Sequence, residues 1–370
     1  MAKGLGRLLC LAVCAVVLAA APAPTPAAAQ EGGQPPVKTV SPEVAQAVDA
    51  LKAGKVARAA AFLRPAAEAG DPAAQALLGQ IYLDGGDGIT PDAVEAGRWL
   101  RLAAANGEPS GAYALAALTD DGTLTPPGMD LSDATARTRE ATRLYLVAAE
   151  AGSVPGMVET GARYTRGIGT PRDMAAARRW FRQAADAGNA HAQFNLGVLY
   201  ASGAVADGTP DMAAARPWFE AAAAQGHPQA QYNLGLAAAQ GLGQPVDHAA
   251  AGRWFAAAAA SGLADAQAGL AYLTYQGLGV TKDEATAAEL YARAAEQGHL
   301  IAQNRLARLY VIGRGVDANM AEAWKWHTLA GGAGFDDPEL DARFARDLTP
   351  EQRRDGDARA AQWLASRPKP

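Results

Sequence analysis

The stretch AQFNLGVLYASG, residues 192–203, returns three times downstream in altered form. Its successors are AQYNLGLAAAQG (230–241), AQAGLAYLTYQG (266–277) and AQNRLARLYVIG (302–313). Each copy leads into a second apolar segment that closes on a glycine. A period near 36 residues is typical of solenoids, in which each unit is one supersecondary motif stacked on its neighbours. The chain is therefore predicted to be a stacked array, which favours a binding function over catalysis.

Closing glycines mark the ends of the units. Seven units follow Gly70, at successive spacings of 37, 45, 36, 38, 36, 36 and 36 residues, and residues 42–70 form a half-unit before it. The closing glycines are Gly70, Gly107, Gly152, Gly188, Gly226, Gly262, Gly298 and Gly334. The chain is 49% hydrophobic but only 6% aromatic, so alanine, the best helix former, carries much of the apolar content. The predicted fold class is all-α, with an αα-hairpin solenoid over residues 42–334.

Three recurrent positions have structural explanations. The first helix of each unit carries A-Q-x-x-L-G-x-x-Y, and the small residue after the leucine predicts a close helix approach, because a mid-helix glycine otherwise costs about 1 kcal/mol. The second helix begins at Asp or Asn, the preferred N-cap residues. A tryptophan eight residues before the closing glycine is predicted to pack within the repeat. The three sets are Gly79, Gly161, Gly197, Gly235, Ala271 and Ala307; Asp92, Asp173, Asp211, Asp247, Asp283 and Asn319; and Trp99, Trp180, Trp218, Trp254 and Trp326.

The array is interrupted at two places. In the second unit Thr119 replaces the tyrosine, Leu144 replaces the tryptophan, and a loop at 120–133 is inserted, at a kind of site that often carries function in solenoids. Past Gly334 the repeat stops. Residues 348–365 are predicted to form a charged helix that starts near Thr349-Pro350 and covers the last apolar face, so 335–370 are assigned to a capping helix and tail.

Residues 1–29 have the layout of a secretory signal peptide. Lys3 and Arg7 precede an apolar stretch that is short for a membrane span, and Ala27-Ala28-Ala29 offers a cleavage site. Retention of this segment as an anchor is the alternative. Residues 30–41 are rich in Gly and Pro and are predicted to be a flexible linker. Both cysteines lie within residues 1–29, so the predicted mature chain has no disulfide, thiol nucleophile or thiolate ligand.

Charge and motifs argue against several functional classes. The formal net charge is −5 and becomes more negative by two if the cations of residues 1–29 are removed, which disfavours nucleic acid and anionic membranes as partners. The sequence has no G-x-S-x-G, H-E-x-x-H or P-loop motif. No pair among His191, His227, His248, His299 and His327 has helical metal-ligand spacing. We therefore predict no enzymatic activity, no metal, no cofactor and no membrane insertion of the mature chain.

The combined pattern A-x-A-Q-x-x-L-G-x-x-Y-x-x-G-x-G, followed by D-x-x-x-A-x-x-W-x-x-x-A-A-x-x-G, resembles the Sel-one-like repeat, a relative of the tetratricopeptide repeat. The resemblance covers roughly residues 42–334 and recurs in phase seven times. It implies a right-handed superhelix of helix pairs with a concave groove. It also implies a role as an adaptor or scaffold for protein complexes, and exported bacterial members resemble regulators that dock on envelope partners.

The same resemblance indicates which variable positions of the first helices face the groove. These are Phe194, Val198, Ser202, Tyr232, Leu236, Gln240, Tyr272, Tyr275, Gln276 and Arg308. Aromatic and Arg side chains are frequent interface anchors, so the groove is hypothesised to bind an extended peptide or a partner helix. The alternative is that some of these rings pack against the neighbouring helix.

The predicted function is that of an exported, periplasmic interaction scaffold or regulatory adaptor that binds a protein or peptide in its groove. Two alternatives remain open: a cell-envelope enzyme or accessory factor related to peptidoglycan, and a secreted protein that interacts with host factors. The enzyme would need an acidic pair in the groove, and the predicted groove positions contain none. The identity of the partner and the oligomeric state do not follow from the sequence.

Overall fold

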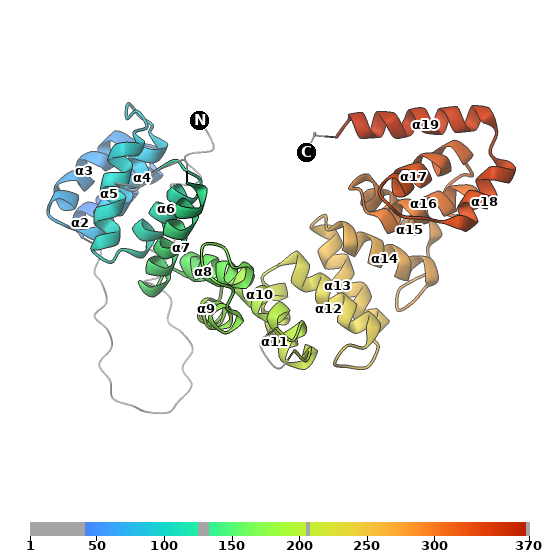
Figure 1. The fold of residues 1–370 in the computed structure, drawn as a ribbon, viewed down its shortest axis with the longest axis horizontal. Coiled ribbons are helices and arrows are strands. Elements are labelled where there is room, and N and C mark those ends of the chain that lie inside the picture. The colour runs from blue at the N-terminus through green and yellow to red at the C-terminus, as the bar shows by residue number, and fades with distance from the viewer. Residues whose placement is uncertain (1–40, 125–132, 205–207, 368–370) are drawn as a thin grey trace. The chain divides into compact units, whose positions relative to one another are not determined.

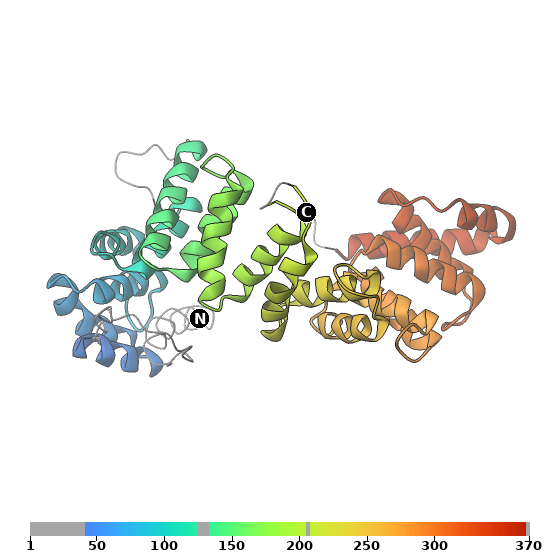
Figure 2. The ribbon, with the colours of Figure 1, turned by 90° about the horizontal axis from the view of Figure 1, so that it is seen from below.

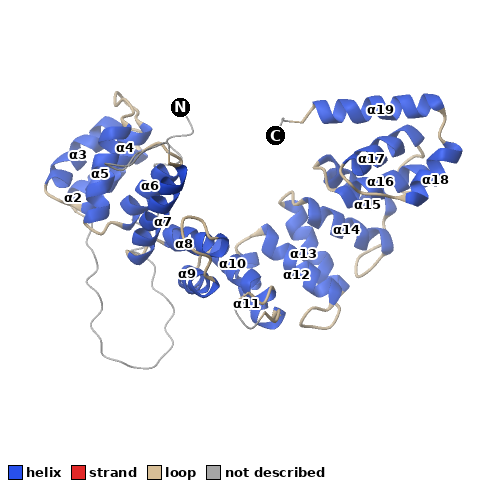
Figure 3. Cartoon of the chain, in the orientation of Figure 1, coloured by secondary structure: helices blue, strands red, loops and turns tan. Residues whose placement is uncertain are grey.

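A computed structural model describes residues 41–124, 133–204 and 208–367. Within those ranges the chain forms 18 α-helices and no strand, with one isolated bridge between Gly86 and Ile89 (Figure 3). The all-α prediction is confirmed for the described residues. The predicted signal peptide, the linker up to residue 40 and most of the inserted loop at 120–133 lie outside them.

The first compact unit of the chain ends at Gly188 (Figure 1). Consecutive helices in it pack side by side as pairs. Its helices are α2 (Pro42–Lys52), α3 (Val56–Glu68), α4 (Pro72–Asp84), α5 (Ala93–Ala105), α6 (Pro109–Asp120), α7 (Ala134–Glu150), α8 (Val154–Arg166) and α9 (Met174–Asp186). The segment 42–70, which the glycine spacing marks as half a unit, holds the two helices α2 and α3. The irregular second unit is also a helix pair, α6 and α7.

The second compact unit begins at Asn189. It continues the pairing and ends in two further helices. Its helices are α10 (Ala190–Ala201), α11 (Met212–Ala224), α12 (Pro228–Gln240), α13 (His248–Ala260), α14 (Ala264–Gln276), α15 (Glu284–Glu296), α16 (Leu300–Ile312), α17 (Met320–Gly332), α18 (Pro338–Asp347) and α19 (Pro350–Ala365).

The predicted N-caps of the second helices are confirmed. Asp247, for example, lies in an extended conformation before α13 and its carboxylate accepts the Ala250 N–H at 2.8 Å. Each cap satisfies backbone donors of the first turn that have no partner inside the helix. The same geometry occurs at Asp92, Asp173, Asp211, Asp283 and Asn319.

The small residue of the first helix does mark a close helix approach, and the side chain that packs there is the residue after the tryptophan position. A Cβ atom added to Gly235 would lie 2.6 Å from the ring of Phe255, the residue after Trp254. Gly161 faces Phe181 and Gly197 faces Phe219 in the same way. The position after the tryptophan slot is buried in all seven units, whereas Trp180, Trp218 and Trp254 are only half-buried. The buried set is Leu100, Tyr145, Phe181, Phe219, Phe255, Tyr291 and His327.

The contact between Gly235 and Phe255 predicts opposite outcomes for two helical glycines. Gly235→Ala should destabilise the protein by about 1–2 kcal/mol, because the clash with Phe255 outweighs the gain in helix propensity. Gly331→Ala, in α17, should be neutral or stabilising by up to about 1 kcal/mol, since nothing lies within 4 Å of the added methyl group. Urea unfolding followed by circular dichroism measures both changes. Destabilisation of the same size at both sites would contradict the proposed fit between Gly235 and Phe255.

The glutamine of the A-Q pair joins consecutive units, a role that the sequence analysis missed. Gln231 on α12 is buried and donates to the Ala223 carbonyl of the preceding helix at 3.3 Å. Gln75 and Gln303 repeat this bond, each to the carbonyl eight residues earlier. The bond satisfies a carbonyl in the last turn of one helix from the first turn of the next. It therefore fixes the stacking of one pair upon the next.

The C-terminal end of the second unit is covered by two helices where one was predicted. Thr349 caps α19 through a capping box with Gln352, which confirms the predicted helix start. Helix α19 packs along α17, and in Figure 2 both lie within the red end of the ribbon with α18. Trp363 meets Trp326 edge to face, with ring centroids 6.1 Å apart. The unpredicted helix α18 inserts Leu340 and Phe344 into the same core.

Candidate peptide-binding hollow

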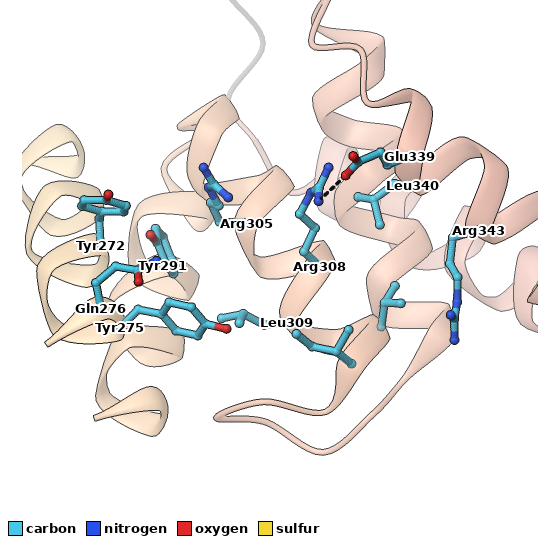
Figure 4. Close-up of a pocket in the computed structure, with 12 residues that line it drawn as sticks. Tyr272, Tyr275, Gln276, Tyr291, Arg305, Arg308, Leu309, Glu339, Leu340 and Arg343 are labelled. Atoms are coloured by element: carbon cyan, nitrogen blue, oxygen red, sulfur yellow. Dashed lines mark ion pairs between the residues drawn. The ribbon is translucent and has the colours of Figure 1, made fainter. Parts of the chain in front are cut away.

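Helices α14, α16 and α18 border a surface hollow of about 560 Å³ in the second unit, here named the C-terminal hollow (Figure 4). Four predicted groove residues line it: Tyr272, Tyr275, Gln276 and Arg308. Tyr291 from α15 contributes as well. The complete lining is Tyr272, Tyr275, Gln276, Tyr291, Arg305, Arg308, Leu309, Val311, Ile312, Glu339, Leu340 and Arg343.

The other predicted groove residues do not line this hollow. Phe194 stacks on His227, with ring centroids 4.6 Å apart, and also contacts Phe219. Tyr232 and Leu236 pack against the core around Phe255. For these three side chains the alternative stated above, packing within the array, describes their position. Val198, Ser202 and Gln240 are exposed outside the hollow.

Two apolar side chains of the hollow are unusually exposed. Tyr272 on α14 is 46% exposed and Ile312 at the end of α16 is 55% exposed. Tyr291, which also lines the hollow, is buried, and burial raises the pKa of its hydroxyl to about 12. Exposed apolar surface beside polar groups is typical of interaction sites. The hollow therefore offers apolar contact area with a polar edge.

Arg308 is held at the edge of the hollow by an ion pair across the end of the repeats. Its Nε and Nη2 atoms donate to the two carboxylate oxygens of Asp337 at 2.9 and 2.7 Å. Asp337 is buried, accepts a 2.6 Å bond from Asn304, and also caps α18 by accepting the Leu340 N–H. A paired, two-point contact of this kind fixes a guanidinium in one orientation. Arg308 is therefore a positioned cation, not a freely moving surface side chain.

The protonation of Asp337 is expected to control the local stability of α18. Burial alone would raise the pKa of Asp337, but the hydrogen bonds from Arg308, Asn304 and the Leu340 N–H outweigh burial and lower this pKa to about 2. Because the pKa in the folded state lies below the unfolded value of about 3.9, the stabilisation is complete above that value and is lost as pH falls towards 2. Protection factors of the α18 amides in hydrogen exchange should therefore drop between pH 4 and 2.

Asp337→Asn provides the control for this pH dependence. The variant lacks the titrating carboxylate, so its α18 protection should be lower at pH 5 and should change little down to pH 2. Amides of α14, which are remote in sequence from Asp337, serve as the internal reference. A drop of the same size in the variant and in the unmodified chain would show that another group controls α18.

Two histidines at equivalent positions, His227 and His299, cap the first helices of their repeat units. The Nδ1 atoms of His227 and His299 accept backbone N–H groups and so act as N-caps of α12 and α16. His227 is buried and its Nε2 lies 3.1 Å from Nδ1 of His191; burial, followed by the charge of His191, lowers the pKa of His227. Over the described parts of the chain, no cluster of three or more His, Cys, Asp or Glu side chains could hold a metal ion.

Several residues of the hollow were not predicted. Arg305 lies three positions before Arg308 on α16, a spacing that places two side chains on one helix face and could have indicated it. Tyr291 lies on α15, the second helix of its repeat unit, whereas the resemblance indicates groove positions on the first helices only. Glu339, Leu340 and Arg343 lie on α18, beyond the last repeat, where no consensus marks the positions.

Comparison with known proteins agrees with this architecture. The family model described as Sel1 repeat matches residues 72–108, 154–189, 190–227, 228–263, 264–299 and 300–335, together more than half of the chain. The pair α6–α7, whose sequence is irregular, falls between the first two matches. None of the curated proteins matches the chain.

Solved structures show similar repeat folds. A Sel1 repeat protein from Oxalobacter formigenes is 24% identical, with a TM-score of 0.50 over 79% of this chain and 97% of that one. A protective antigen of uropathogenic Escherichia coli with an SLR fold is 25% identical, with a TM-score of 0.44 over 87% of this chain and 83% of that one. The likeness to the Oxalobacter protein supports the fold alone. In the portion of the chain that the structure describes, no helix has both the length and the apolarity to cross a membrane.

Proposed function

The chain belongs to the Sel1 repeat family, and from this premise we propose that it is an interaction scaffold which binds a peptide segment of a partner protein in the C-terminal hollow. Repeats of this family generally mediate protein interactions. The observation that carries the proposal is the exposure of Tyr272 and Ile312 beside a positioned Arg308. Aromatic and Arg side chains are enriched among the residues that dominate binding energy at interfaces.

The walls of the hollow are suited to an extended segment. Helix α14 supplies Tyr272 and Tyr275 on one side, and α18 supplies Leu340 on the other, with α16 between them (Figure 4). Two of the lining residues, Tyr291 and Leu309, are buried in the core of the second unit. A preformed surface reduces the ordering cost of binding. We further propose that the protein acts outside the cytoplasm, a proposal supported by the signal-like layout of residues 1–29.

Peptide binding provides the test of this proposal. Binders selected from a phage-displayed library of random dodecamers on the full chain should lose at least fivefold in affinity with Tyr272→Ala, since truncation of an interface anchor costs more than about 1 kcal/mol. Fluorescence polarisation with the synthetic peptides measures the change. Val94→Ala is the matched control, because Val94 is 77% exposed and lies on α5, outside the hollow. The proposal is wrong if no peptide binds, or if Tyr272→Ala and Val94→Ala behave alike.

A further inference from the structure

We propose that the segment bound in the C-terminal hollow carries an aspartate or glutamate side chain beside an apolar one, and that its carboxylate binds between Arg305 and Arg308 in place of Glu339. This inference rests on the proposed function and specifies the chemistry of its ligand. Three observations support it: the orientation of Arg308, the exposure of Glu339, and the lack of an ion pair or hydrogen bond to Arg305 among the described residues.

One nitrogen of the Arg308 guanidinium, Nη1, is paired only with Glu339, a partner that a ligand could displace. Asp337 occupies Nε and Nη2 and is buried, so that contact belongs to the fold. The remaining nitrogen, Nη1, lies 2.9 Å from Glu339, whose side chain is 81% exposed. An ion pair with so exposed a partner is screened by water and contributes little to stability. Glu339 can therefore leave Arg308 without disturbing the contact between Arg308 and Asp337.

Arg305 lies one turn before Arg308 on the same helix, and Figure 4 shows the two side chains pointing the same way from α16. Among the described residues, no ion pair or hydrogen bond engages Arg305. Two guanidinium groups on neighbouring turns lie within reach of one carboxylate. Arg305 and Arg308 together therefore form a site for a carboxylate that Glu339 fills only in part.

The charge of the hollow contrasts with that of the chain. Three arginines and one glutamate line the hollow, while the whole chain has a formal net charge of −5. Arg343 is paired with Asp347 at 2.5 Å, so the unbalanced positive charge lies at Arg305. Figure 4 shows Arg305 between Tyr272 of α14 and Arg308, and the exposed ring of Tyr272 is available to an apolar side chain next to the carboxylate. The combination matches a carboxylate next to an apolar group.

The decisive experiment compares matched peptides. Peptides selected on the full chain should be enriched in Asp and Glu beside apolar residues. Replacement of that acidic residue by its amide should weaken binding about five- to twentyfold, an effect that added salt reduces. Arg305→Gln should weaken binding of the acidic peptide about three- to tenfold and leave the amide peptide unchanged. Arg253→Gln is the control, because Arg253 is an exposed arginine on α13, outside the hollow.

Glu339→Gln provides a prediction of opposite sign. Removal of the competing carboxylate should strengthen binding of the acidic peptide about two- to fivefold without changing binding of the amide peptide. Peptides that bind through Tyr272 but show no preference for acidic residues would overturn this inference and leave the proposed function standing. Loss of binding on amidation of the peptide C-terminus, in place of the side-chain effect, would also overturn it. If no peptide bound at all, both proposals would be wrong.

Discussion

Phe255→Ala is expected to lower the free energy of unfolding by about 3–5 kcal/mol, the range for removal of a buried phenylalanine. The ring lies against Gly235 and Gly269, where no side chain is present to fill the space, so the cavity cannot collapse easily. Urea unfolding followed by circular dichroism measures the loss. Hydrogen exchange should show it first in α12, α13 and α14, because neighbouring pairs in a solenoid share one core.

Trp254→Ala is the matched control for this prediction. Trp254 is larger than Phe255 and occupies the position at which tryptophan recurs in the repeat, but it is only half-buried. Its removal should cost about half as much as removal of Phe255, since the free energy follows the apolar area taken from water. If Trp254→Ala cost as much as Phe255→Ala or more, the tryptophan would be the central core residue after all.

Asp120→Ala is expected to cost about 3 kcal/mol, because it leaves a buried guanidinium without its counter-charge. Arg163 on α8 is buried and bonds Asp120 of α6 at 2.5 Å. Its guanidinium also bonds Thr142 at 2.9 Å and lies 4.6 Å from the ring centre of Tyr145, both on α7. The pair thus connects the irregular second unit to the third. Thermal and urea unfolding of the full chain measure the loss.

Arg163→Leu tests the same ion pair by removing the arginine in place of Asp120. In four other units the position two residues after the small residue is a buried leucine or isoleucine, namely Ile81, Leu199, Leu273 and Leu309, and in the unit of Gly235 it is the buried Ala237. Leucine should therefore fit at 163, and Asp120 is exposed enough to be solvated once its partner is gone. We expect Arg163→Leu to cost less than about 1 kcal/mol and to abolish most of the penalty of Asp120→Ala in the double variant. Additive losses in the double variant would contradict this account.

Features that depend on local sequence were predicted well. The caps at Asp247 and Thr349 follow from the preference of short polar side chains for the first free N–H groups of a helix. The close approach at Gly235 follows from the cost of a glycine within a helix. The side chain that uses this space, the ring of Phe255, was not identified from the sequence. Only the direction of each side chain around the helix distinguishes Trp254 from Phe255.

The candidate site was predicted in part. Tyr272, Tyr275, Gln276 and Arg308 line the hollow, whereas Phe194 and Tyr232 pack against neighbouring rings. An aromatic residue at a variable position satisfies either environment equally well, and the size of the adjacent side chains decides between them.

The sequence by itself determined the period, the helix pairs and the caps, because each depends on contacts within about one turn or one unit. The tertiary structure alone decided what Arg308 does. Its partner Asp337 lies 29 residues away, beyond the last repeat, and caps α18, a helix that the periodicity does not cover. A repeat pattern predicts contacts between equivalent positions, and the contact between Arg308 and Asp337 joins a repeat position to a residue that has no equivalent in the array. The hollow exists because the array ends there and α18 borders its open edge.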